Sequence, residues 1–176
     1  MTKWAGSLYL KSKLFLLCPS LLLSHKTTLL VILTPFLFRG LHSLFVTCPE
    51  AKPLFGFSMN VPLEEIRESK RLLIHASFIV EMIEKALEML GGDDKELTDF
   101  MTDLGKKHIA YGVKPEYMPL MQQSIVHMLK SMLTEKNGFT EKDEKAWQAV
   151  LSALVADMTR AQREVEMQTI ADAMVI

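Results

Sequence analysis

The chain has 176 residues, enough for one domain of ordinary size, and 49% of them are hydrophobic. Its formal net charge of −1 lacks the basic excess expected of a nucleic-acid-binding domain, and its two cysteines are too few for a disulfide framework. Twelve methionines, with only 8 glycines and 7 prolines, favour a helical protein over a β-sandwich or a disordered chain.

The first part of the chain differs in character from the rest. It contains no Asp or Glu before Glu50, whereas its basic residues are Lys3, Lys11, Lys13, Lys26 and Arg39. The runs "LFLLCPSLLL" and "TLLVILTPFLF" are strongly apolar, but the polar residues 24–28 and Pro35 interrupt them. A signal peptide, membrane association through residues 1–38, and an irregular apolar extension are all open interpretations. We favour an apolar, basic extension over residues 1–35.

From residue 60 onward, apolar residues recur at the spacing of three and four that is typical of a helix face. Asn60 and Pro62 predict the start of the first such helix and Gly91-Gly92 its end. Its stripe is Leu72, Ala76, Ile79, Met82, Ile83, Ala86, Leu87 and Leu90. The next stripe is Leu97, Phe100, Met101 and Leu104, with His108 four residues on. Gly112 and Pro115 predict that this helix closes and another opens.

Two further stripes complete the pattern. One comprises Met118, Met121, Ile125, Met128, Leu129 and Met132, and the other Trp147, Val150, Leu151, Leu154, Val155 and Met158. Thr140 is a predicted N-cap of the last helix, with Glu141 and Asp143 in its first turn. No run after residue 60 alternates as a β-strand does. The sequence therefore predicts an all-α fold.

Two consecutive predicted helices each place one histidine on their apolar face. His75 lies three residues after Leu72 and four before Ile79, and His108 continues the following stripe. A single buried histidine is most simply a neutral side chain bonded to a backbone carbonyl. Two such residues on neighbouring helices also fit a metal in a flat apolar macrocycle, which takes a nitrogen lone pair from each side. Zinc fits poorly because no Cys, Asp or Glu is grouped with them.

Four segments carry a family resemblance. "LGKKHIAYGVKPEYMPLMQQSIVHML" resembles the proximal-histidine segment of globins, and "LLIHASFIVEMI" resembles the preceding helix with the distal histidine. "LFVTCPEAKPLFGF" is similar to the globin bend upstream, and "FTEKDEKAWQAVLSALVADM" to the last long helix. The resemblance spans residues 36–160 and is nearest to neuroglobin-like and globin-X-like animal globins. It implies a globin-like fold over residues 36–162, followed by a C-terminal helical tail over residues 163–176.

The resemblance also implies a site. His108 is expected to be the proximal ligand of the iron of haem b (iron protoporphyrin IX), and His75 the distal residue or second ligand. Phe55 is expected against the haem face and Ile79 above the iron. Val113 and Met118 are expected to line the proximal edge, and Leu151 to meet the haem from the last helix.

Several features depart from the globin pattern. No convincing first helix precedes residues 40–45, which resemble only the end of a second helix. Phe78 stands at a position that is often basic in this family, and Phe57 replaces a Tyr, so two expected partners of the haem propionates are missing. Lys107, Tyr111 and Lys114 remain candidates for that role.

The resemblance implies a cytoplasmic, non-enzymatic protein that reversibly binds O2, CO or NO. It further implies bis-histidyl coordination in the resting state, with a redox or sensing role and a reductase as a possible partner; nitric-oxide or nitrite chemistry would be secondary. The sequence suggests no nucleic-acid partner. A haem-free helical interaction domain and a membrane-associated globin, or one secreted through its apolar N-terminal segment, are the alternatives.

Overall fold

The computed structural model describes residues 40–67, 69–90, 94–134 and 140–174. Residues 40–47 form a helix, and the 3₁₀ helix η2 (Pro49–Phe55) follows it. The α-helices are α3 (Leu63–Ile66), α4 (Lys70–Met89), α5 (Asp94–Ala110), α6 (Tyr117–Thr134) and α7 (Glu141–Met174). No strand occurs in these ranges, which confirms the all-α prediction. The predicted extension and the question of a first helix lie outside the described residues.

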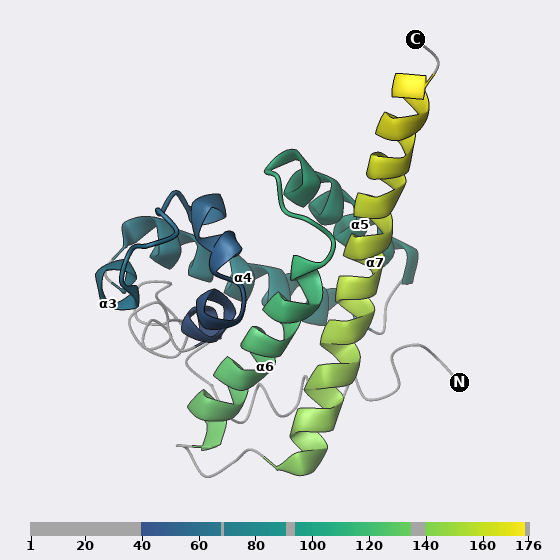
Figure 1. Cartoon of the computed structure of the whole chain (residues 1–176). Helices are drawn as coiled ribbons and strands as arrows, with labels where there is room; N and C mark the ends of the chain where they lie inside the picture. Colours follow the sequence, from purple (N-terminus) through teal and green to yellow (C-terminus); the bar gives the residue numbers. More distant parts are fainter. Residues whose placement is uncertain (1–39, 68, 91–93, 135–139, 175–176) are drawn as a thin grey trace.

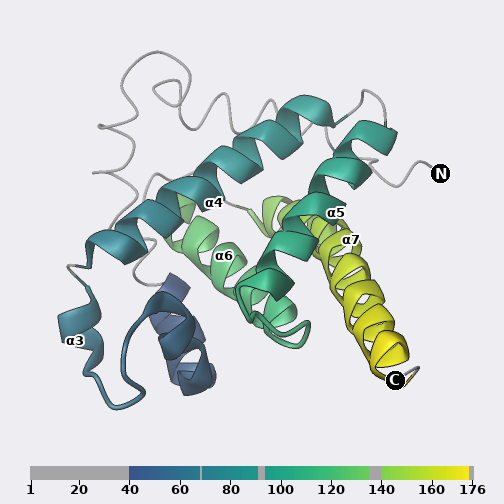
Figure 2. The ribbon, with the colours of Figure 1, turned by 90° about the horizontal axis from the view of Figure 1, so that it is seen from above.

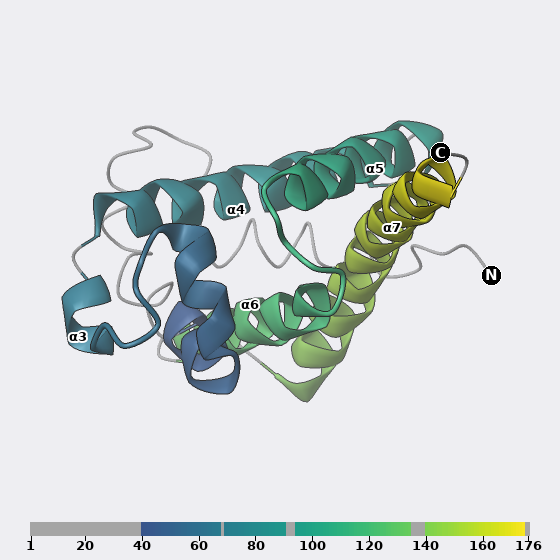
Figure 3. The same cartoon turned by 45° about the horizontal axis from the view of Figure 1, so that its top comes forward.

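The long helices form two layers. Figure 3 shows α4 and α5 lying over α6 and α7, and Figure 2 shows α4 and α5 meeting at an angle. Helix α5 packs most extensively on α7, and α6 also packs along α7. The apolar stripes of α4 to α7 together form the main core, so the predicted faces are the buried ones. None of the described helices is both long and apolar enough to cross a membrane.

A second, smaller core joins the start of the described chain to α4. Leu41, Leu44 and Phe45 are buried with Ile66 and Leu72, and Phe55 and Phe57 are among the side chains that pack on them. Gly40 allows this segment to approach α6 closely, because a Cβ atom on Gly40 would lie only 2.9 Å from the carbonyl oxygen of Ser124. The second core therefore anchors the 3₁₀ helix beside the N-terminal half of α4.

The first predicted helix starts later than Asn60 and Pro62 suggested. The chain forms the single turn α3 and then begins α4 at Lys70, after Ser69 in an extended conformation. The buried amine of Lys52 donates hydrogen bonds to the carbonyl oxygens of Met59 (3.1 Å) and Val61 (2.9 Å). These bonds hold residues 59–61 in a loop, because the carbonyls of Met59 and Val61 accept from the Lys52 side chain instead of from a helix amide.

The predicted break between α5 and α6 is confirmed. Gly112 has a φ of 81°, in the left-handed region that glycine tolerates best. The Val113 amide turns back to donate to the carbonyl oxygen of His108 (3.0 Å). Pro115 is buried before α6 begins at Tyr117.

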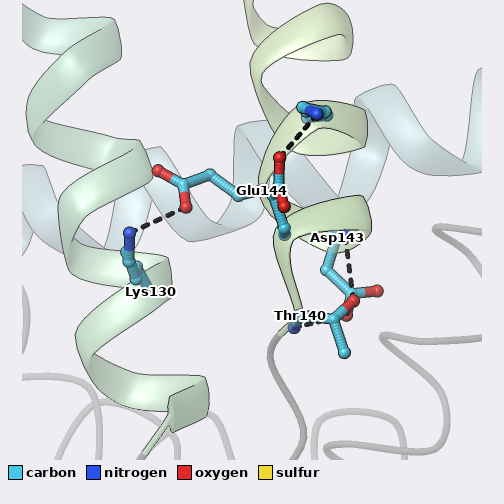
Figure 4. A network of polar contacts seen from close by, with 6 residues as sticks. Lys130, Thr140, Asp143 and Glu144 are labelled. Atoms are coloured by element: carbon cyan, nitrogen blue, oxygen red, sulfur yellow. Dashed lines mark hydrogen bonds and ion pairs between the residues drawn. The ribbon is translucent and has the colours of Figure 1, made fainter.

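The predicted cap of α7 is also confirmed. The Asp143 amide donates to the hydroxyl oxygen of Thr140 (3.3 Å), and the Thr140 amide donates to the Asp143 carboxylate (2.7 Å) (Figure 4). This reciprocal pairing satisfies two backbone donors at the helix start. One residue on, the amine of Lys130 pairs with the Glu144 carboxylate at 2.7 Å and links α6 to α7 (Figure 4).

Helix α7 runs for 34 residues and projects beyond the other helices at its C-terminal end (Figure 1). Its buried residues extend from Asp143 to Gln162. Beyond them, Met167, Ile170 and Met174 are 70%, 58% and 82% exposed. The helix is thus continuous through residue 162, but only its first two thirds contribute to the core.

Candidate functional site

His75 lies in the first half of α4, on the face that also carries Ile79. Its ring meets that of Phe55 edge to face, with 5.0 Å between the ring centroids. The described residues offer no hydrogen-bond partner to the His75 nitrogens. Burial, with a smaller contribution from the charge of His108, lowers the pKa of His75 to about 4. His75 is therefore a neutral imidazole at pH 7, with a nitrogen lone pair available.

His108 lies in the last turn of α5, where its Nδ1 is 2.8 Å from the carbonyl oxygen of Leu104. A carbonyl can only accept, so Nδ1 carries the hydrogen and Nε2 keeps its lone pair. Burial lowers the pKa of His108 as well. This arrangement is the usual one for a metal-binding histidine, whose second nitrogen donates to a carbonyl and thereby fixes the ring orientation.

A charge on His108 would help to lower the pKa of His75, so the two imidazoles lie within electrostatic range of each other. Of the other predicted site residues, Ile79, Met118 and Leu151 are buried in the main core, and Val113 packs against it. Phe55 packs on the second core and reaches the region through its contact with His75. The helices thus bring together, within apolar surroundings, two neutral imidazoles that can each offer a nitrogen lone pair to a metal.

Further ring contacts and a hydrogen bond hold Phe55 in place against His75. The Phe45 ring packs edge to face on Phe55 at 5.3 Å and on Phe57 at 6.4 Å, measured between centroids. A guanidinium nitrogen of Arg71, one turn before His75, donates to the carbonyl oxygen of Phe55 (3.2 Å). Phe57 therefore serves in packing, and Arg71 ties the 3₁₀ helix to α4. Sequence reasoning missed this bond because a loop brings the two residues together.

Gly105 is a second residue whose importance the sequence did not explain. A Cβ atom there would lie 2.4 Å from the carbonyl oxygen and 2.9 Å from the Cα atom of Met158. The glycine thus lets α5 approach the backbone of α7 three residues before His108. The "LGKKH" segment contained this glycine, but only the helix packing reveals what it allows.

The candidate partners of the propionates remain on the surface. Lys107, Tyr111 and Lys114 are all exposed, at the end of α5 and in the turn after it. Phe78, at the often basic position, is 59% exposed and offers no charge. Lys106, beside Lys107, is also exposed, as expected of a solvent-facing lysine.

Cys48 lies near the site but has a different character. Its thiol donates to the carboxylate of Glu50 (3.3 Å), and burial is the largest cause of a raised pKa. A thiol that resists deprotonation is a poor nucleophile and a poor redox sensor. The geometry therefore gives Cys48 a packing role.

Fold and site together define a class of protein. Two neutral imidazoles on separate helices, one with its outer nitrogen bonded to a carbonyl and both in apolar surroundings, suit a metal held in a flat apolar macrocycle. The residues present thus fit haem.

The globin family model matches residues 39–158. The chain is 32% identical to neuroglobin of Tetraodon nigroviridis over 118 residues, which cover 66% of this chain and 72% of the relative. Its identity to neuroglobin of Danio rerio is 33% with the same coverage. The chain belongs to the globin family and is similar to neuroglobins. It is therefore a haem-binding, gas-binding globin.

Solved structures agree on the fold. A Drosophila melanogaster globin superposes with a TM-score of 0.69 at 20% identity, covering 91% of this chain and 94% of the other. A hexa-coordinate hemoglobin of the same organism gives a TM-score of 0.67 at 20% identity, covering 90% and 93%. This similarity supports the helical arrangement and, at such low identity, nothing finer.

Proposed function

We propose that His108 is the proximal ligand of haem b, that His75 is the second axial ligand in the resting state, and that the protein binds O2, CO or NO in a redox or sensing role. The observation that carries the proposal is the bond from His108 Nδ1 to the Leu104 carbonyl, which directs Nε2 away from the backbone. When bound, the haem iron supplies the reversible coordination of a diatomic gas.

The pair of imidazoles supports the two-ligand assignment. His75 has a nitrogen lone pair, no competing hydrogen bond among the described residues, and a pKa well below 7. A gas ligand would have to displace it or accept a hydrogen bond from it. The resemblance to neuroglobin-like globins, which implies bis-histidyl coordination, points in the same direction.

The other predicted residues would shape the cavity. Phe55 and Ile79 would lie on the distal side, Val113 and Met118 on the proximal side, and Leu151 beneath from α7. We assign this site to a globin domain over residues 36–162, which the family match over residues 39–158 supports. Lys107, Tyr111 and Lys114 would meet the propionates, and a reductase would be the partner that keeps the iron ferrous.

The first test is the ultraviolet–visible spectrum of the dithionite-reduced protein. Sharp visible bands with an intense Soret peak would support both axial histidines, whereas a broad five-coordinate band would contradict the role of His75. Absence of a Soret band after expression with haem would instead favour a haem-free globin scaffold.

Two substitutions and a matched control test the ligands. His108→Ala should abolish stoichiometric haem retention, because it removes the axial bond. His75→Leu should keep haem but convert the ferrous spectrum from six- to five-coordinate. His127→Leu is the control, since His127 is exposed on α6. Haem retention in His108→Ala like that of the control would contradict the proximal assignment.

A further inference from the structure

Gln162 is a polar residue in a fully buried position of α7. Its side chain is 0% exposed, and its amide nitrogen donates to the carbonyl oxygen of Val113 (2.8 Å). Its own side-chain oxygen has no partner among the described residues, and neither has the buried hydroxyl of Thr159, one turn earlier. Within the described residues, the bond to Val113 is therefore the one polar contact that orients the Gln162 side chain.

This arrangement is not what packing alone would favour. A buried polar atom without a partner costs about 1–3 kcal/mol, and an apolar side chain of similar volume would avoid that cost. The donated bond reaches the turn between α5 and α6, where the Val113 carbonyl lies outside both helices. Gln162 therefore acts on the position of this turn.

The turn leads directly to His108. Val113 accepts the bond from Gln162 at its carbonyl, and its amide donates to the carbonyl oxygen of His108 (3.0 Å). Val113 thus connects the buried side-chain amide of Gln162 to the last turn of α5. One turn earlier in α7, the backbone of Met158 meets Gly105 of α5.

We propose that Gln162 is a positioning residue for the proximal histidine, acting through Val113 on the last turn of α5. The proposal rests on the assignment of His108 as the proximal ligand. Gln162 touches neither the haem nor the gas in this scheme. It positions the His108 backbone, and hence the imidazole that would hold the iron.

Gln162→Met tests this role, because methionine keeps the length of the side chain and removes the donor. The control is Gln168→Met in the same helix, where the amide of Gln168 bonds the Asp172 carboxylate on the exposed surface (2.7 Å). Both changes are made in the haem-loaded protein carrying His75→Leu, so that the iron has a single protein ligand. Resonance Raman spectroscopy of the ferrous form then reports the iron–histidine stretching frequency.

We expect Gln162→Met to shift this frequency and to speed haem loss by about tenfold, the equivalent of one buried hydrogen bond. Gln168→Met should change neither. Lower thermal stability with an unchanged frequency would show that Gln162 serves packing alone, and would overturn the proposal.

A second measurement separates this proposal from the ligand assignment. Hydrogen exchange of the Val113 amide should be faster in Gln162→Met than in Gln168→Met, whichever residue binds the iron. If the parent protein shows no iron–histidine mode while this exchange changes, the proximal assignment fails and the link from Gln162 to the turn stands. Unchanged exchange would refute the link itself.

Discussion

Replacement of Gly105 by alanine would test how closely α5 approaches α7. Ordinary contacts of a Cβ atom begin near 3.4 Å, whereas this one would meet the Met158 carbonyl oxygen at 2.4 Å. The atoms it meets are backbone, so no side chain can rotate away. The two helices would have to separate by roughly 1 Å, within a core packed at crystal-like density.

Two opposing free energies decide the result. Alanine in a helix interior is more favourable than glycine by about 1 kcal/mol, whereas forcing extra volume into a packed interface costs about 1–3 kcal/mol. Because α5 packs on α7 more extensively than any other pair does, we expect the cost to win. The free energy of unfolding should fall by about 1–2 kcal/mol, and haem loss should become faster because His108 lies one turn away.

The assay is urea unfolding followed by circular dichroism, with equal haem concentrations because a bound cofactor adds to apparent stability. Lys106→Ala is the matched control, as Lys106 is the exposed neighbour on the same helix. Equal or greater stability of Gly105→Ala would refute the close approach, since only the helix-forming advantage of alanine would then remain.

Three further predictions concern the site and the caps. In the haem-free protein, the lowered pKa of His75 means that the unfolded chain binds the extra proton first as the pH falls. The contribution of His75 to the free energy of unfolding is therefore complete above pH 6.5, and the free energy falls by about 3 kcal/mol toward pH 4. Urea midpoints that do not fall over this range in the wild type, or that fall equally in His75→Leu, would contradict this prediction. Asp143→Ala should lower the unfolding free energy by about 1 kcal/mol through loss of its pairing with Thr140, and a melting temperature equal to wild type would argue against the cap. Arg71→Met should remove the bond between α4 and the Phe55 carbonyl and raise the rate of CO binding to the ferrous protein by about 2–5-fold in flash photolysis, whereas an unchanged rate would show that Arg71 does not influence His75.

What could be predicted from the sequence is what depends on local spacing. The apolar stripes of α4 to α7 recur with the helix period, so they located the buried faces and placed His75 on one of them. The α7 cap needs residues only three apart, Thr140 and Asp143, and was predicted for that reason. The turn at Gly112 likewise carries its signal within a few residues.

What could not be predicted depends on contacts between distant parts of the chain. Gln162 donates to Val113, which is 49 residues away in sequence, and Arg71 donates to Phe55, which is 16 residues away. No periodic pattern in the sequence predicts either pair. The late start of α4 also depends on a contact between separated residues, because Lys52 donates hydrogen bonds to two carbonyl oxygens in the loop that precedes the helix. A lysine, a glutamine and an arginine in such places look like ordinary surface residues until the fold brings their partners to them.

The first part of α7 is buried in the core and its C-terminal end is exposed, so the two parts should differ in their dynamics. Amides near Trp147 and Leu151 are shielded by the core and should exchange with solvent only when the whole domain opens. Near Met167 and Met174 the helix has few tertiary contacts, and a short unsupported helix is marginal in water. That end should therefore unwind and reform on the submicrosecond timescale of isolated helices while the first part stays intact. One continuous helix should thus contain both slowly and rapidly exchanging amides.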